Sequence, residues 1–281
     1  KPDVLIGNGM LAASLLRFVG EAPLKVGIIH HLYHTTKLGG QDGRMAWLVG
    51  TLERAALRLV KLDRIGVVNP LVKDILVRRG FREDRIVVVG NGVNTDDYLF
   101  SERKVPNSLI YIGSLRKLKG VDLLIEVVSI LKNTIPGVTL HIVGDGPKRE
   151  EVKRRIAALG ISDSVVLHGY VPEREKVELL SNCAVYVSNS RFEGFGIPVV
   201  EAMATGTVPV VSNIGGHQFV LQGQDAGYLV DSVEEMAVKV ADLLTHEARR
   251  SELARNGRKL VEEKRTWVKV GQRYRELIAV A

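Results

Sequence analysis

The sequence has very little cysteine, because its 281 residues include only Cys183. A single thiol cannot form a disulfide within the chain, and it cannot build a zinc site that needs several cysteines. Such cysteine-poor chains are typical of a reducing compartment. We therefore expect a cytoplasmic protein without structural disulfides.

Long apolar runs and acidic metal-binding pairs are also missing. No stretch reaches the eighteen or so apolar residues of a spanning helix, and the nearest candidate, Val4 to Gly20, is interrupted by Asn8 and Arg17. No Asp-x-Asp pair occurs, so we expect no metal ion on a diphosphate, and no cofactor is indicated. Aromatic residues make up only 5%, and no run resembles a basic tail or an RNA-binding module with interleaved aromatics, which argues against a nucleic-acid partner.

What the chain does have is an excess of positive charge, with a formal net charge of +7. Residues 1–100 carry 14 basic and 10 acidic side chains, and the remainder carries 25 and 22, so neither part concentrates the excess. A nucleotide or an anionic lipid surface would suit this charge. An ordinary solvated basic surface would explain it equally well.

Short runs of Val, Ile and Leu alternate with amphipathic stretches through most of the chain. Such runs are typical of strands buried on both faces, and their alternation with helices predicts α/β architecture with doubly wound parallel sheets. The predicted strands span 4–6, 26–30, 64–68, 86–89, 109–112, 139–143, 165–168, 185–188, 208–212 and 227–229. The predicted helices span 46–61, 123–132, 148–158, 174–180, 199–204, 233–244, 251–264 and 267–279.

The length predicts two domains, at roughly 150 residues per domain. The polar segment 101–107 contains Pro106 and is the predicted linker. We expect residues 108–262 to form a complete second domain and 263–281 to form a closing helix that packs back on the first. Residues 1–100 begin directly on a buried strand, so we expect them to be only the C-terminal half of a first domain.

Residues 190–206 carry the strongest chemical signal. They read Ser-Arg-Phe-Glu-Gly-Phe-Gly-Ile-Pro-Val-Val-Glu-Ala-Met-Ala-Thr-Gly and follow a predicted strand. The two loop glycines allow a tight turn, and Pro198 suits the first position of a helix. The amides of Phe195, Gly196 and Ile197 would then be free at a helix N-terminus, which is an anion-binding geometry.

Two carboxylates flank this predicted anion site, Glu193 in the loop and Glu201 in the helix. A carboxylate beside a phosphate would repel it. We therefore expect both glutamates to accept hydrogen bonds from sugar hydroxyl groups.

Two further loops follow predicted strands. Residues 113–120 read Gly-Ser-Leu-Arg-Lys-Leu-Lys-Gly and place Arg116 and Lys119 where they could neutralise a diphosphate. Residues 144–147 read Gly-Asp-Gly-Pro, which predicts a turn. A basic loop such as the first is, taken alone, more often just solvated. The second, taken alone, is a plain turn and a weak signal.

Together, these loops resemble the retaining glycosyltransferases of family 4, and the resemblance covers nearly the whole chain. Glu193 and Glu201, eight residues apart around Gly-Phe-Gly, match the family's strongest signature. Residues 113–120 resemble its diphosphate loop, 144–147 its glycine turn and 168–171 its base-contacting segment. The resemblance implies the GT-B fold, in which two Rossmann-like domains face a cleft, with the first domain only partly present here.

The resemblance also implies a role for each site residue. Glu193 would hold hydroxyl groups of the transferred sugar, Glu201 would bind the ribose, and Lys119 would bind the diphosphate. His30, at the end of a first-domain strand, would face the donor sugar. The family usually has an arginine where this chain has Ser114, and Arg116 is the natural substitute. The remaining donor-binding positions are Gly113, Ser114, Gly144, Gly169, Val171, Phe195, Gly196 and Ile197.

The basic first domain predicts a peripheral contact with the cytoplasmic face of a membrane, since family members often use lipid acceptors there. An ordinary solvated helix face fits the same residues, which are Arg44, Arg54, Arg58, Lys61 and Arg64. His30, His31 and His34 cluster as metal ligands can, but no cysteine is near and we expect no metal site.

We therefore expect a transferase that moves a sugar from a nucleotide-sugar to a hydroxyl group of a glycan or glycolipid acceptor, without a metal. Retention of the anomeric configuration is implied by the resemblance. Two alternatives stay open from the sequence: a sugar-nucleotide epimerase on the same fold, and a non-catalytic nucleotide-sugar binding protein derived from a truncated transferase.

Overall fold

The computed structural model describes residues 2–16, 19, 22–30 and 62–279. The predicted helix over 46–61 lies outside the described residues, as do His31, His34, Arg44, Arg54, Arg58 and Lys61. The chain divides into two compact units, of which unit 1 comprises Lys1–Gly92 with Trp267–Ala281, and unit 2 comprises Val93–Thr266.

Unit 1 contains a sheet of four parallel strands in the order β1-β2-β3-β4. In the described part of the chain, β1 pairs with β2 alone and so lies at the edge of this sheet. All four strands were predicted from the sequence. They are β1 Val4–Asn8, β2 Leu24–Ile29, β3 Arg64–Val67 and β4 Ile86–Val88.

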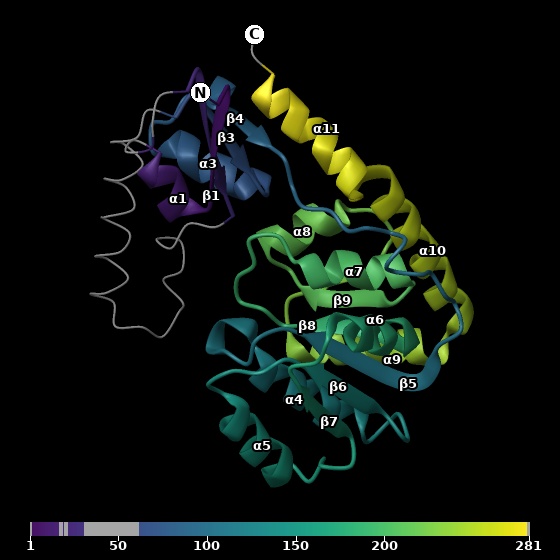
Figure 1. Cartoon of the computed structure of the whole chain (residues 1–281). Helices are drawn as coiled ribbons and strands as arrows, with labels where there is room; N and C mark the ends of the chain where they lie inside the picture. The colour runs from purple at the N-terminus through teal and green to yellow at the C-terminus, as the bar shows by residue number, and fades with distance from the viewer. Residues whose placement is uncertain (1, 17–18, 20–21, 31–61, 280–281) are drawn as a thin grey trace. The chain divides into compact units, whose positions relative to one another are not determined.

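Helices cover both faces of this sheet. On one face, α1 (Met10–Leu15) and α3 (Pro70–Arg78) bury Ala13 and Leu76 in one apolar cluster. On the other face, α11 (Trp267–Ile278) buries Leu277 in a second cluster. The last helix of the chain is therefore part of the core of unit 1 (Figure 1).

Unit 2 contains a sheet of six parallel strands in the order β10-β9-β8-β5-β6-β7. This is the doubly wound order, in which the direction of strand succession reverses between β5 and β8. All six strands were predicted, and β6 and β9 have the predicted bounds. They are β5 Val105–Ile112, β6 Thr139–Val143, β7 Val165–Gly169, β8 Cys183–Ser188, β9 Val208–Ser212 and β10 Tyr228–Val230.

The helices of unit 2 lie on both sides of the six-stranded sheet (Figure 1). One large apolar cluster joins the sheet to α4, α5 and α9, whose inward residues are mostly Val, Leu and Ile. The helices are α4 Val121–Leu131, α5 Arg149–Ala158, α6 Glu173–Asn182, α7 Ile197–Thr205, α8 Gly215–Leu221, α9 Val233–Thr245 and α10 Glu247–Lys264. The sequence analysis did not predict α1, α3 or α8.

The boundary between the units falls between Gly92 and Val93, upstream of the segment 101–107 in which the sequence predicts a linker. The reason is that the chain joins unit 2 early. The Val93 amide donates to the Arg265 carbonyl at 2.9 Å, and the Ser101 amide donates to the Thr205 carbonyl at 3.2 Å. Residues 105–107 already belong to β5.

Among the helices of the described residues, none combines the length and the apolar character that crossing a bilayer requires.

Candidate functional site

The loops that follow β5 and β8 meet where the strand order of unit 2 reverses, which is the usual ligand crevice of a doubly wound sheet. The Arg191 amide donates to the Leu118 carbonyl at 2.8 Å and ties the two loops together. Gly120 has a left-handed backbone with φ of 60°, and a Cβ there would lie 1.9 Å from the Asn189 carbonyl oxygen. Only glycine allows the two loops to approach so closely.

Three of the predicted donor-binding glycines form one connected edge of this site. The Gly113 amide donates to the Val143 carbonyl at 2.9 Å, and the Gly144 amide donates to the Gly169 carbonyl at 2.7 Å. Gly144 has φ of 127°, and a Cβ there would lie 2.1 Å from the Gly113 oxygen. The structure thus brings Gly113, Gly144 and Gly169 together, although Gly113 and Gly169 are 56 residues apart in the sequence.

The N-terminus of α7 offers unused amide donors. Gly196 is its N-cap, with φ of 96°, and Pro198 occupies the first turn. The amides of Phe195, Gly196 and Ile197 donate to no other group in the part of the chain that the structure describes. They lie at the positive end of the helix dipole, so they are free to bind an anion.

Glu193 is anchored through only one of its two carboxylate oxygens. Oε1 accepts from Lys119 Nζ at 2.5 Å and from Ser190 Oγ at 3.0 Å. Oε2 has no hydrogen-bond partner among the described residues. The carboxylate is mostly buried, with 18% of the side chain exposed. Lys119, which the sequence assigns to the diphosphate, is therefore bound to Glu193 here and keeps two further N–H groups for a ligand.

Glu201 shows the same arrangement. Oε1 accepts from Tyr98 Oη and from Lys176 Nζ, each at 2.9 Å, and Oε2 has no hydrogen-bond partner in the described part of the chain. Tyr98 Oη also lies 2.8 Å from Glu173 Oε1. Burial, helped by the negative charge of Glu201, raises the pKa of Tyr98, so its phenol stays protonated and acts as a donor.

Sequence reasoning missed Tyr98 and Lys176. Tyr98 lies 103 residues before Glu201, and Lys176 lies 25 residues before it on α6. Neither belongs to a glycine-rich loop, which is the signal that marked the other site residues.

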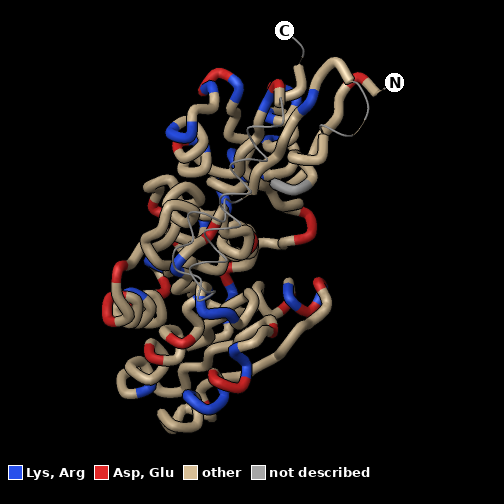
Figure 2. The backbone as a smooth tube through the Cα atoms, turned by 90° about the vertical axis from the view of Figure 1, so that its left-hand side faces the viewer, with Lys and Arg blue, Asp and Glu red and all other residues tan. Residues whose placement is uncertain are grey.

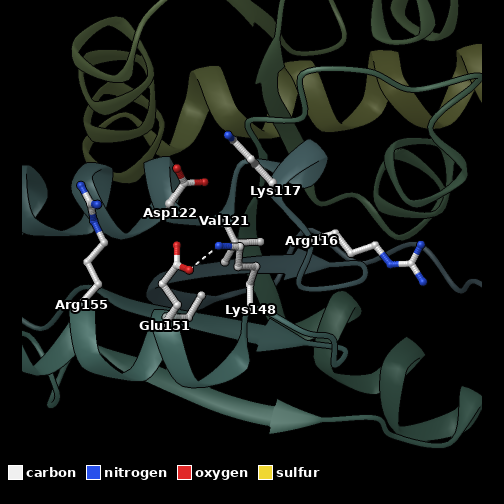
Figure 3. A pocket seen from close by; sticks show the side chains of 8 residues that line it. Arg116, Lys117, Val121, Asp122, Lys148, Glu151 and Arg155 are labelled. Atoms are coloured by element: carbon white, nitrogen blue, oxygen red, sulfur yellow. Dashed lines mark hydrogen bonds and ion pairs between the residues drawn. The ribbon is translucent and has the colours of Figure 1, made fainter. Parts of the chain in front are cut away.

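The basic loop borders a cavity of about 200 Å³. Lys148 and Glu151 line the cavity and form an ion pair with each other, and Figure 3 shows Arg116 pointing away from that pair. Arg116 is exposed, and its guanidinium makes no hydrogen bond within the described residues. Its predicted phosphate role stays a prediction. The Ser114 carbonyl accepts from Tyr111 Oη at 3.1 Å.

Two further predicted residues lie elsewhere. His30 follows β2 in unit 1, where its Nε2 lies 2.7 Å from Asn8 Oδ1. Val171 follows β7 in unit 2 and is half-buried, while its neighbour Tyr170 is 88% exposed.

Basic and acidic residues alternate over the tube of unit 2 without a single large block of one sign (Figure 2). No group of three metal-ligating side chains occurs among the described residues.

Comparison with protein families gives two adjoining matches. The model of the glycosyl transferases group 1 matches residues 96–260, and the model of glycosyltransferase family 4 matches residues 1–97.

Curated relatives include an MMP alpha-(1->4)-mannosyltransferase of Mycolicibacterium hassiacum, which is 31% identical over 281 residues, 95% of this chain and 68% of that protein. A glycogen synthase of Mycobacterium tuberculosis is 30% identical, over 80% of this chain and 55% of that protein. A mannosylfructose-phosphate synthase of Agrobacterium fabrum is 29% identical, over 60% and 40%. The chain thus spans about half the length of such relatives.

Solved structures share the fold. Anabaena HepE in complex with UDP and glucose matches with a TM-score of 0.84 and 18% identity, over 98% of this chain and 77% of that chain. TarM of S. aureus matches with a TM-score of 0.81 and 20% identity, over 99% and 55%. The fold of these neighbours is GT-B, as the sequence resemblance implies.

Proposed function

The chain belongs to the group 1 glycosyl transferases of family 4, and on that premise we propose that it transfers a sugar from a nucleotide-sugar donor to a hydroxyl group of an acceptor. The acceptor that the sequence favours is a glycan or a glycolipid. Contact with a membrane stays a prediction, because most of the basic residues behind it lie outside the described part of the chain.

One observation carries this proposal. Two carboxylates, each with one oxygen held by the protein and the other unengaged by the described residues, flank three free amides at the N-terminus of α7. Acceptor oxygens suit the hydroxyl groups of sugars, and helix-terminal amides suit phosphate. A nucleoside diphosphate sugar contains both, with a hydroxyl-bearing ring on each side of its two phosphates.

We assign the two rings from the order of the groups along the chain. Glu193 lies on the loop beside Lys119, and we assign it to the transferred sugar. Glu201 lies one turn further along α7, and we assign it to the ribose. UDP is the nucleoside diphosphate we propose first, since HepE was solved with UDP and with UDP-glucose.

The reaction breaks the bond between the anomeric carbon and the diphosphate oxygen and forms a bond from that carbon to the acceptor oxygen. The acceptor hydroxyl loses its proton, and the diphosphate leaves with the bonding electron pair. The main task of the protein is then to stabilise the charge that develops on the leaving group. The amides of Phe195, Gly196 and Ile197 and the ammonium of Lys119 are placed for this, and one such preorganised donor contributes about 2.7–4 kcal/mol.

We further propose that the configuration at the anomeric carbon is retained and that the reaction needs no metal ion. The proposal on the metal rests on the cations of the loop 113–120, above all Lys119 and Arg116, which can balance the charge of a diphosphate.

Isothermal titration calorimetry tests the proposal. The full chain is titrated with UDP, UDP-glucose and AMP in a buffer with excess EDTA. We expect both uridine ligands to bind and AMP, a control with one phosphate and another base, to bind at least tenfold more weakly. Release of UDP from UDP-glucose and an acceptor panel, followed by mass spectrometry, then tests transfer. Failure of every nucleotide-sugar to bind, with or without added Mn²⁺, would refute the function.

A further inference from the structure

His217 is a buried histidine beside the candidate site that neither the sequence motifs nor the function proposed above uses. It lies in the first turn of α8, and only 1% of its surface is exposed. Its Nδ1 lies 2.8 Å from the Ser212 carbonyl oxygen. A carbonyl only accepts hydrogen bonds, so Nδ1 carries the ring proton and the lone pair of the neutral ring is on Nε2.

The ring of His217 lies directly against the loop of the candidate site. A Cβ on Gly196 would lie 3.2 Å from its Cδ2 and 3.7 Å from its Nε2. The preceding residue, Gly216, is equally close, since a Cβ there would lie 2.5 Å from the Glu193 carbonyl oxygen. The first turn of α8 therefore packs against both ends of the segment from Glu193 to Gly196.

Nε2 of His217 has no hydrogen-bond partner among the residues that the structure describes. Nε2 is not fully buried. It keeps contact with solvent although the rest of the ring is buried. An acceptor atom of this kind, next to Gly196, can serve a ligand in the site.

The charges around the ring favour its neutral form. Burial lowers the pKa of His217, and the positive charge of Lys119 acts in the same direction, while the Ser212 carbonyl and the negative charge of Glu193 oppose it. A neutral ring presents a lone pair at Nε2. A hydroxyl group can donate to that lone pair, whereas an ionised phosphate oxygen cannot.

We propose that His217 accepts a hydrogen bond through Nε2 from a hydroxyl group of the transferred sugar and thereby contributes to the choice of sugar. This role rests on the nucleotide-sugar function proposed above. It places His217 next to Glu193 as a second acceptor for the same ring. The first turn of α8 then takes part in donor recognition together with the loops after β5 and β8.

Two variants separate this role from a structural one. The side-chain amide of His217→Asn overlaps Nδ1, so it keeps the donor to Ser212 and loses the acceptor at the position of Nε2. The longer side chain of His217→Gln places its amide near Nε2 and can restore an acceptor there. Each variant and the wild-type chain are titrated with UDP and with UDP-glucose.

We expect UDP to bind all three proteins within twofold. UDP-glucose should bind His217→Asn about 3- to 10-fold more weakly than the wild type, as expected for one lost hydrogen bond, and His217→Gln should recover at least part of the difference. The proposal would be overturned if His217→Asn bound UDP and UDP-glucose more weakly by the same factor, or if its binding of UDP-glucose were unchanged. Failure of the wild type to bind any nucleotide-sugar would instead refute the proposed function, on which this inference depends.

Nitrogen NMR of the histidine rings gives a readout that is independent of affinity. The ring signals of His217 are those missing from His217→Asn. In the free protein they should show the Nδ1–H tautomer, and saturation with UDP-glucose, but not with UDP, should shift Nε2 toward the value of a hydrogen-bonded acceptor. A proton on Nε2 in the free protein, or the same shift with both ligands, would contradict the role.

Discussion

At the scale of single residues, Glu193 and Glu201 each use one oxygen to bind the protein, and the other has no hydrogen-bond partner among the described residues. Their partners differ in character, since Lys119 and Ser190 hold Glu193, whereas Tyr98 and Lys176 hold Glu201. The sequence predicted both glutamates, because they stand in a loop and helix that glycine and proline define. It could not predict Tyr98 or Lys176, because a contact across 103 residues leaves no local pattern.

The different assignments of the two glutamates predict different binding defects. Glu201→Gln should weaken the binding of UDP and of UDP-glucose together, because the ribose is common to both ligands. Glu193→Gln should weaken the binding of UDP-glucose and leave the affinity for UDP within twofold of the wild type. A hydrogen bond to a charged group contributes about 1.5–3 kcal/mol, which corresponds to a loss of roughly 10- to 150-fold. Calorimetry with both ligands measures it, and equal losses of UDP in the two variants would contradict the assignment.

At the scale of elements, the regular alternation of apolar runs predicted all ten strands, since buried parallel strands are short and almost purely apolar. The same approach missed α1, α3 and α8. These helices have six, nine and seven residues, so few apolar positions repeat. For α3 the signal was present in Asn69 and Pro70, because the Asn69 side chain accepts from the Val72 amide at 2.8 Å.

The loop contact at Gly120 predicts a matched pair of glycine variants. Gly120 and Gly160 have similar left-handed backbones, with φ of 60° and 64°, but a Cβ on Gly160 would meet nothing within 4 Å. Gly160→Ala should cost about 1 kcal/mol of unfolding free energy from backbone strain alone. Gly120→Ala should lower the unfolding free energy by at least about 1 kcal/mol more than Gly160→Ala, because a loop must move to make room for the Cβ. It should also weaken the binding of UDP.

Urea denaturation and calorimetry measure the two effects of this pair. If the two variants lose the same stability and both bind UDP like the wild type, the close approach of the β5 and β8 loops is not what builds the site.

Lys104 connects the ends of two helices of unit 2 and predicts a pH dependence of stability. Its Nζ donates to the Ser181 carbonyl near the end of α6 at 2.8 Å and to the Thr205 carbonyl at the end of α7 at 2.9 Å. Burial lowers the pKa of Lys104 to about 8, below that of a free lysine. The unfolded chain therefore binds more protons than the folded chain from about pH 8 to about pH 10.4, and stability rises with pH in that range.

Comparison with Lys104→Met isolates this contribution. Between pH 7 and pH 9.5 the wild type should gain about 1–2 kcal/mol of unfolding free energy relative to the variant. Urea denaturation at both pH values measures the difference. A constant difference between the two proteins would show that Lys104 stays charged throughout.

At the scale of the whole molecule, the residues that hold Glu193 and Glu201 all belong to unit 2, and so do the free amides of α7. The sequence predicted the division into two domains but placed the linker at 101–107, because it could not show that Tyr98 and Ser101 bond to unit 2. His30 is the one proposed site residue in unit 1. Binding of the nucleotide and transfer of the sugar should therefore depend on the two units differently.

This division predicts the behaviour of unit 2 alone. Residues 93–266 should fold, since their apolar cluster is separate from those of unit 1, and should bind UDP within about threefold of the full chain. The isolated unit should transfer no sugar. Circular dichroism, thermal unfolding and calorimetry measure these properties. A folded unit 2 that does not bind UDP would show that the nucleotide also needs residues of unit 1.

The chain enters unit 2 at Val93 and leaves it at Thr266, and these two residues form a β-bridge with each other. Unit 2 therefore has the topology of a cassette inserted into unit 1, with its two ends joined at one point of its surface. Domains whose ends lie together tolerate insertion and exchange, because the host chain needs no adjustment to receive them. Recombination at these two positions could replace one donor-binding module with another in a single event, while the host unit kept its own last helix and its core.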